Sequence, residues 1–165
     1  MQRRLLVSAC LMGVPVRYDG ADNQSKVSDL LLWLQRWQQQ NRLIIVCPET
    51  LGGLPTPRPA AELAGGDGYA LLRQQARVIT HDGQDVSEVF LEGARRCLAL
   101  AQQHQAGAAL LAARSPSCGN QEIYNGRFEH QLQPGAGVTV AVLETAGIRC
   151  FNPSQVTELL QWMEP

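Results

Sequence analysis

Three cysteines in this sequence each follow a short apolar run with the length of a buried β-strand. They are Cys10 after residues 5–9, Cys47 after residues 43–46, and Cys118, which follows residues 108–113 and a Ser/Pro turn. Parallel strands joined by helices place their carboxyl ends on one edge of a sheet, so these thiols are predicted to meet there. Thiolate is a soft ligand that favours zinc, copper(I) or iron-sulfur clusters, and a metal centre is therefore a candidate chemistry.

The turn that carries Cys118 is rigid and polar. It reads Ser115-Pro116-Ser117-Cys118-Gly119. Proline fixes φ and lacks an N–H group, glycine permits a positive φ, and the two serine hydroxyls can donate hydrogen bonds to a sulfur atom or an oxyanion. Such a turn at a strand exit is poorly suited to filling a core, and it indicates a thiol that is presented for chemistry.

Spacing alone leaves three interpretations of these thiols open. A structural zinc site usually takes four ligands, often as Cys-x-x-Cys pairs, and the sequence has no such pair. Three separate cysteines suit a cubane cluster in which one iron keeps a position free for a substrate atom. The alternatives are three independent core cysteines, or one thiolate nucleophile at Cys10 or Cys118. A nucleophile needs a base, and His81, His104 and His130 are expected in turns or at a helix end, away from the cysteines.

The other two cysteines are predicted to be core residues. Cys97 falls on the apolar face of an amphipathic helix expected over residues 86–103. Cys150 lies inside the apolar run at residues 148–151, which is typical of a short buried strand. Neither position indicates a metal ligand.

The alternation of predicted strands and helices indicates an α/β fold. We expect one three-layer αβα, Rossmann-like domain over residues 1–165, with a mostly parallel sheet and possible side hairpins. Residues 69–80 are expected to be extended, and Asn125-Gly126 is a hairpin signal. The predicted helices span residues 26–40, 86–103, 138–146 and the stretch from Pro153 onward.

Composition sets outer bounds on function. The chain has 165 residues, of which 45% are hydrophobic and 18% charged, as in an ordinary globular protein. A net charge of -1 argues against a large basic surface for nucleic acid. No apolar run approaches the roughly 20 residues that cross a bilayer, and the amino terminus lacks the pattern of a signal peptide. We therefore expect a cytoplasmic protein with no membrane partner, in which the five cysteines are thiols or ligands rather than disulfides.

Three polar or glycine-rich segments are candidates for binding. Residues 17–20, Arg-Tyr-Asp-Gly, place a cation, a phenol and a carboxylate after the first strand, and a solvated turn is the alternative. Residues 48–59 are dense in proline and glycine, and are expected to form a rigid loop beside Cys47. Gly135 to Gly137 open a predicted helix, whose N–H groups can hold a phosphate or carboxylate.

Seven short motifs in this order resemble the DUF523 family of 2-thiouracil desulfurases, and they cover nearly the whole chain. The family is a set of small bacterial desulfidases. One departure is Ala112, which stands where many relatives carry a lysine. The motifs are Ser8-Ala9-Cys10-Leu11-x-Gly13, Arg17-Tyr18-Asp19-Gly20, Cys47-Pro48-Glu49, Leu51-Gly52-Gly53-Leu54-Pro55-x-Pro57-Arg58, Gly83-x-Asp85-Val86, Phe90-x-x-Gly93-Ala94 and Ser115-Pro116-Ser117-Cys118-Gly119.

The resemblance implies a cofactor and a reaction. Cys10, Cys47 and Cys118 would hold a [4Fe-4S] cluster with one open iron. The enzyme would remove sulfur from a small thiolated pyrimidine, 2-thiouracil or its nucleotide, by non-redox hydrolysis that releases sulfide. A non-catalytic cluster-binding module and a persulfide-forming sulfurtransferase are the alternatives, because both would use the same cysteines.

The same resemblance gives roles to residues near the cysteines. Glu49 is the first candidate for the general base that activates water, because it lies two residues after Cys47. Asp19 is the second candidate, either as a base or as a brace for its turn. Ser115, Ser117 and Ser8 are expected to donate to cluster sulfides or to the pyrimidine carbonyl. The candidates for a nucleotide phosphate are Arg17, Arg58 and the turn from Gly135 to Gly137.

Overall fold

The computed structural model describes residues 2–165 and has a four-stranded parallel sheet at its centre. The strand order is β2-β1-β5-β8, and every neighbouring pair is parallel. This confirms the predicted α/β class with a mostly parallel sheet. The four strands are β1 (Arg4–Ser8), β2 (Leu43–Val46), β5 (Ala106–Leu110) and β8 (Arg149–Phe151).

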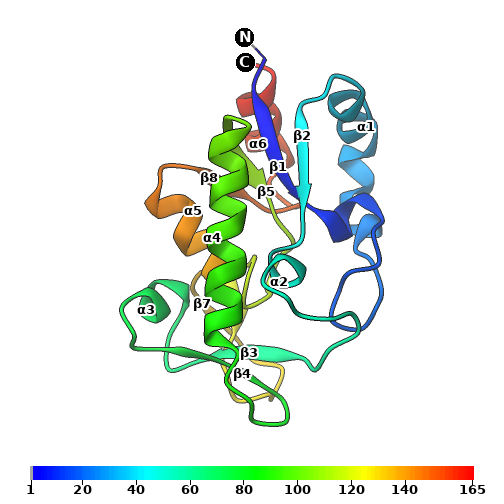
Figure 1. The fold of residues 1–165 in the computed structure, drawn as a ribbon. Helices are drawn as coiled ribbons and strands as arrows, with labels where there is room; N and C mark the ends of the chain where they lie inside the picture. The colour runs from blue at the N-terminus through cyan, green and yellow to red at the C-terminus, as the bar shows by residue number, and fades with distance from the viewer. Residues whose placement is uncertain (1) are drawn as a thin grey trace.

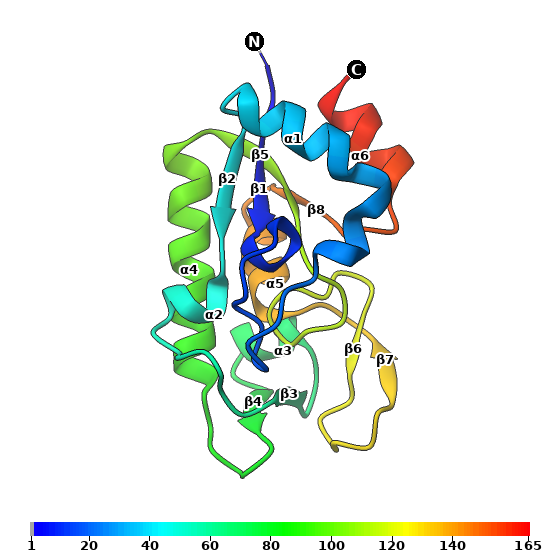
Figure 2. The same cartoon turned by 90° about the vertical axis from the view of Figure 1, so that its right-hand side faces the viewer.

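Helices cover both faces of this sheet (Figures 1 and 2). On one face, α1 and α6 pack on Leu5 and Val7 of β1. On the other face, α4 and α5 pack on Leu6, because successive strand residues point to opposite sides. The helices are α1 (Leu31–Gln39), α4 (Ser87–Gln103), α5 (Val138–Thr145) and α6 (Val156–Met163).

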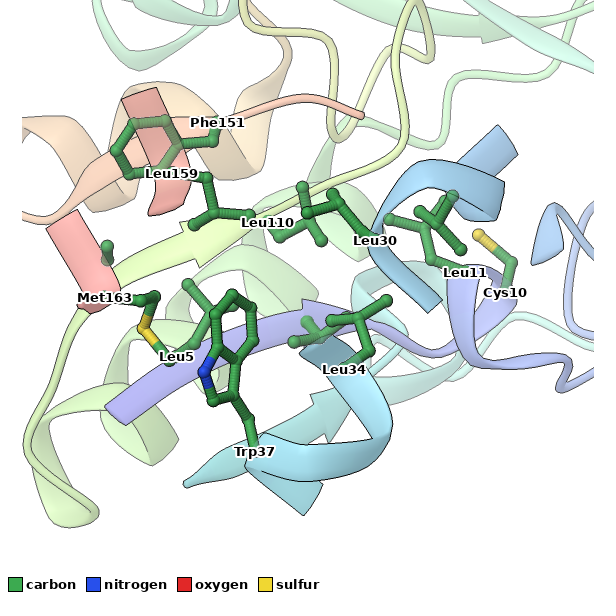
Figure 3. Close-up of a cluster of buried hydrophobic side chains, with 13 residues drawn as sticks. Leu5, Cys10, Leu11, Leu30, Leu34, Trp37, Leu110, Phe151, Leu159 and Met163 are labelled. Atoms are coloured by element: carbon green, nitrogen blue, oxygen red, sulfur yellow. The ribbon is translucent and has the colours of Figure 1, made fainter. Parts of the chain in front are cut away.

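Cys10 lies at one end of the apolar cluster between the sheet and helices α1 and α6 (Figure 3). The cluster is built on Trp37 and Phe151, both fully buried, and continues through Leu30 and Leu11 to the turn after β1. The turn is a short 3-10 helix, η1 (Ala9–Met12). A packed hydrophobic layer therefore fixes the backbone that carries the first cysteine.

Helix α4 shows how local sequence positions a long element. Asp85 Oδ1 accepts a hydrogen bond from Ser87 N at 2.9 Å, which satisfies one free N–H at the helix start. Its buried positions Phe90, Ala94, Cys97 and Ala101 recur at intervals of three or four residues. The predicted helix over residues 86–103 is therefore confirmed.

The smaller elements extend beyond the carboxyl edge of the main sheet. Two antiparallel pairs form there, β3 with β4 and β6 with β7. The β6–β7 hairpin has the predicted Asn125-Gly126 in its connection, whereas β4 pairs with β3, a strand that was not predicted. The segment expected as extended from residue 69 is instead helical at its start, because Asp67 Oδ1 caps Ala70 N at 3.1 Å. The elements are η2 (Gln24–Leu30), α2 (Pro48–Leu51), β3 (Ala61–Ala64), α3 (Gly68–Leu72), β4 (Arg77–Thr80), β6 (Glu122–Tyr124) and β7 (Leu132–Pro134).

Two other predicted helices start differently from expectation. The stretch at residues 26–40 is α-helical only from Leu31. The residues before it form the 3-10 segment η2, in which Val27 has non-helical backbone angles. The last helix begins at Val156 rather than Pro153, since Asn152 Oδ1 accepts a hydrogen bond from Ser154 N at 2.8 Å and forms a turn first. Within the described part of the chain, no helix has the length and apolar character needed to cross a membrane.

Arg42 joins the two ends of the chain, which lie side by side in Figure 1. Its side chain is 3% exposed, and its nitrogens donate to the carbonyls of Arg3 and Met163, both at 2.8 Å. Nη1 donates to Glu164 Oε1 at 2.9 Å, and the same oxygen accepts from Trp37 Nε1. A single buried cation thus satisfies acceptors from both termini.

We expect Arg42→Met to lower the free energy of unfolding by about 2–3 kcal/mol, because it leaves buried acceptors without their charged donor. Urea denaturation measures the change. Arg95→Met, on the exposed face of α4, is the matched control and should be close to neutral. Equal stability of the two variants would contradict this account of Arg42.

Candidate active site

A cavity of about 730 Å³ lies at the carboxyl edge of the main sheet. One wall comes from the ends of β1, β2 and β5, and the other comes from the two hairpins. Parallel α/β sheets place their ligands at this edge. The structure brings all three predicted cysteines, Cys10, Cys47 and Cys118, to the wall of this one cavity.

Each cysteine reaches the cavity from the turn that follows a strand. Cys10 lies in η1 directly after β1, and Cys47 separates β2 from α2. Cys118 lies in the loop between β5 and β6. Sequence separations of 37 and 71 residues thus become neighbouring positions, because β2 and β5 flank β1 in the sheet.

The start of helix α5 holds the Cys118 loop from behind. The N–H groups of Gly137, Val138 and Thr139 donate to the carbonyls of Gly119, Pro116 and Ser117 at 2.7–2.8 Å. Gly135 N likewise donates to the carbonyl of Gln121 at 3.1 Å. The N–H groups that a phosphate at Gly135 to Gly137 would need are therefore engaged within the chain. These hydrogen bonds hold the loop that carries Cys118.

Gly137 permits this contact, because a Cβ atom there would lie 2.4 Å from the carbonyl carbon and oxygen of Ser117. We expect Gly137→Ala to displace the Cys118 loop, to lower the free energy of unfolding by roughly 1–3 kcal/mol and to reduce iron uptake. Gly83→Ala is the control, because its φ of +89° strains the backbone but a Cβ meets open space. Iron analysis after anaerobic reconstitution should separate the two, and equal iron content would contradict the prediction.

Glu49 lies on the cavity wall and is held by Arg58. Arg58 donates to Glu49 Oε2 through Nε at 2.8 Å and also through Nη2. Both contacts use Oε2, so Oε1 is the oxygen available to a ligand. Helix α2, which carries Glu49, packs closely on α4: a Cβ on Gly93 would lie 1.9 Å from the carbonyl of Pro48. The carboxylate is thus fixed by its helix and by its ion pair.

The Arg58 guanidinium is bound within the chain and is not a free cation. Nη1 donates to the carbonyl of Pro55 and to Thr56 Oγ1, both at 3.1 Å, and Nη2 donates to the carbonyl of Val16 at 3.0 Å. With the Glu49 contacts, every guanidinium nitrogen has a partner in the chain. Its predicted phosphate contact therefore stays a prediction, and the geometry favours a role in holding Glu49.

The Arg17 to Gly20 turn is braced from within. Arg17 lines the cavity and pairs with Asp19, Nη2 to Oδ2 at 3.1 Å. Asp19 Oδ1 accepts from Ala21 N at 3.0 Å. Both carboxylate oxygens of Asp19 thus close the turn, which favours the brace over the general base among its two expected roles.

The three predicted serines all lie on the cavity wall and help to order the cysteine turns. Ser115 Oγ accepts from Cys118 N at 2.8 Å. Ser117 shares a 2.7 Å hydrogen bond with Thr139 of α5. Ser8 Oγ accepts from the N–H of Ala112 at 3.1 Å and donates to the sulfur of Cys118. Their expected contacts with a cluster or a substrate stay predictions.

A neutral side chain donates a hydrogen bond to the sulfur of each cavity cysteine. Asn23 and Thr50 were not predicted from the sequence, and Asn23 reaches its sulfur only through a folded loop. A threonine one helical turn after Cys47 was the one local signal. The three contacts are Ser8 Oγ to Cys118 Sγ at 3.8 Å, Asn23 Nδ2 to Cys10 Sγ at 3.4 Å and Thr50 Oγ1 to Cys47 Sγ at 3.1 Å.

Burial and nearby negative charge keep two of these thiols protonated. Burial raises the pKa of Cys10, and the hydrogen bond from Asn23 partly offsets this shift. Burial raises the pKa of Cys118 well above its ordinary value, and the Glu49 carboxylate adds to the effect. Glu49 raises the pKa of both thiols, so its charge lies near both sulfurs. A metal that binds these thiols must displace their protons, so we expect loading to be favoured as the pH rises.

The donor set fits a cluster better than a single ion. All five cysteines are free thiols. Among residues 2–165, no three His, Cys, Asp or Glu side chains lie close enough to hold one metal ion. A [4Fe-4S] cluster binds each cysteine on a different iron, and so needs its ligands further apart than a single ion does. Three thiols around one cavity, each with a hydrogen-bond donor, supply the ligand type and number that a cluster with one open iron needs.

The three histidines lie in turns or at the end of α4, as predicted, but two of them are not remote from the cavity of the cysteines. His81 and His130 line the same cavity as the cysteines, because the two hairpins fold back over the edge of the sheet. His81 packs edge-on against Phe128 at 5.1 Å between ring centroids. The position of a hairpin over a sheet edge depends on tertiary contacts, and no local pattern predicts it.

The prediction that Cys97 and Cys150 are core residues is confirmed. Both are buried between the sheet and helices α4 and α5. Burial raises the pKa of Cys97 to about 12, and it raises the pKa of Cys150 further. These thiols are thus neutral packing groups at physiological pH.

The fold and the cavity define an α/β protein that collects three thiols and a carboxylate at the carboxyl edge of its sheet. Comparison with known proteins identifies the group to which it belongs. The family model for 2-thiouracil desulfurase matches residues 5–155, and the chain belongs to this family.

Two relatives cover almost the whole chain. The Bacillus subtilis (strain 168) protein YbbK is 38% identical over 156 residues, which are 94% of this chain and 99% of YbbK. A solved structure, the [4Fe-4S]-dependent thiouracil desulfidase TudS, is 42% identical, with a TM-score of 0.85 over 98% of this chain and 97% of its own. The α/β fold of this chain is thus the fold of that desulfidase.

Proposed function

We propose that this protein is a [4Fe-4S]-dependent desulfidase that hydrolyses the C=S bond of a thiolated pyrimidine. The observation that carries the proposal is the convergence of Cys10, Cys47 and Cys118 on one cavity that also contains Glu49. Membership of the 2-thiouracil desulfurase family and the likeness to TudS support it. The three cysteines are the proposed ligands, and no fourth cysteine lines the cavity among the described residues.

The reaction exchanges sulfur for oxygen without a change in redox state. Water and the thiocarbonyl yield the carbonyl and hydrogen sulfide. A cluster held by Cys10, Cys47 and Cys118 would supply Lewis-acid chemistry for the thiocarbonyl sulfur. Glu49 takes the proton of the attacking water at Oε1, while Arg58 holds Oε2.

The charge on the cavity wall favours a nucleotide over a free base. Arg17 and the exposed Lys26 and Arg114 lie on this wall, and a phosphate would gain from these cations. The substrate class we propose is 2-thiouracil and its nucleotide, with Ser115 and Ser117 as hydrogen-bonding groups near Cys118.

Anaerobic turnover tests the proposal. The protein is reconstituted with iron and sulfide, desalted and incubated with 2-thiouracil or its 5′-monophosphate. We expect one sulfide and one desulfurated pyrimidine per substrate consumed, and no release after iron is removed by a chelator. Activity that survives iron removal would instead indicate a persulfide sulfurtransferase. A loaded protein that releases no sulfide from either compound would indicate a non-catalytic cluster protein.

A further inference from the structure

Asn23 donates to the sulfur of Cys10 and is itself held by other residues. Its Nδ2 lies 3.4 Å from Cys10 Sγ, and its backbone N–H donates to the carbonyl of the same cysteine at 2.7 Å. The residue therefore contacts Cys10 twice. It lies after the Arg17 to Gly20 turn, at the start of η2.

Arg17 determines which way the amide of Asn23 points. Its Nη1 donates to Asn23 Oδ1 at 2.8 Å. A guanidinium can only donate, so the amide oxygen must face Arg17 and the NH₂ group must face the sulfur. Asp19 in turn holds Arg17 through Nη2 at 3.1 Å, and Ala21 N holds Asp19. The chain of contacts runs from the Asp19 turn to Cys10 without a gap.

We propose that Asn23, held by Arg17 and Asp19, is a positioning residue that retains the cluster at Cys10. The inference rests on the proposed function. A fixed N–H donor orients the ligand sulfur, as residues hydrogen-bonded to metal ligands do in other sites. Hydrogen bonds to ligand sulfurs also set the reduction potential of a cluster. The Arg-Tyr-Asp-Gly turn then supports a metal ligand through Asn23.

The test measures cluster retention rather than turnover. Asn23→Leu keeps the size of the side chain and removes the donor. In anaerobically reconstituted protein, we expect an iron chelator to remove the cluster roughly tenfold faster than from the unsubstituted protein. The decay of the visible absorbance of the cluster measures this rate. Asn23→Asp keeps the acceptor for Arg17 but turns a carboxylate oxygen toward the sulfur, so its cluster should be lost faster still. Both variants should also shift the reduction potential to more negative values.

Controls separate this role from a general loss of stability. Gln161→Leu makes a similar change on the exposed face of α6 and should retain the cluster at the unsubstituted rate. Arg17→Met leaves Asn23 in place but frees its amide, so it should give a smaller increase. If Asn23→Leu fails to fold, judged by circular dichroism, Arg17→Met carries the test alone.

The outcomes are distinct. Cluster loss at the unsubstituted rate in folded Asn23→Leu and Arg17→Met would overturn this inference and leave the proposed function intact. Failure of the unsubstituted protein to take up iron would overturn both.

Discussion

Serine in place of Cys10, Cys47 or Cys118 is expected to leave the protein without its cluster and to reduce desulfurisation by more than about 1,000-fold. Each of these cysteines is a proposed ligand on the cavity wall. A Lewis-acidic iron lowers the activation free energy by several kcal/mol, and each 1.36 kcal/mol changes the rate tenfold. Iron and acid-labile sulfide analysis with a sulfide-release assay measures both effects.

The two core cysteines provide the matched controls. Cys97→Ser and Cys150→Ser make the same atomic change inside the packed layer under α4 and α5. They should cost roughly 1–3 kcal/mol of stability, because a hydroxyl is buried among apolar side chains, yet keep iron and turnover. Equal loss of iron in all five variants would show that the effect comes from unfolding and would contradict the assignment of ligands.

Glu49→Gln is expected to keep the cluster but to lower kcat by about 100-fold to 10,000-fold, which is the range for loss of a general base. The substitution preserves the shape of the side chain and an oxygen that can accept from Arg58. It removes the carboxylate that takes the proton from water. Single-turnover sulfide release by the loaded variant measures this step directly.

Glu158→Gln, on the exposed side of α6, is the control and should leave the rate unchanged. Asp19→Asn addresses the second candidate base. Because Asp19 uses both oxygens within its turn, we expect its replacement to affect cluster retention more than the rate of the loaded enzyme. An unaltered rate in Glu49→Gln together with a large loss in Asp19→Asn would reverse the two roles.

Much of the fold could be predicted because it depends on local apolar patterns. The strands before Cys10 and Cys118, β1 and β5, are buried on both faces, as central parallel strands require. The strand before Cys47, β2, lies at the edge of the sheet and exposes Ile45. Helix α3 was missed because its five residues are too few to show a helical period, and only the capping Asp67 indicated it. Its correct prediction would have required the tertiary contacts that stabilise so short a helix.

The site could be predicted only in part. The strand ends indicated where thiols would meet, and Glu49 followed from its place beside Cys47. The contacts of Asn23 and the approach of His81 and His130 depend on loops that meet only in the folded chain. The full engagement of Arg58 and of the Gly137 turn depends on hydrogen bonds between remote segments, which no local pattern specifies.

The most direct test of the central claim is Mössbauer spectroscopy of ⁵⁷Fe-reconstituted protein, combined with iron and sulfide analysis. We predict four iron and four sulfide per chain, as in the cluster named for TudS, with one iron whose signal changes when 2-thiouracil or its nucleotide binds. Full desulfidase activity in protein that contains no iron, or a cluster retained after Cys10, Cys47 and Cys118 are all replaced, would contradict it.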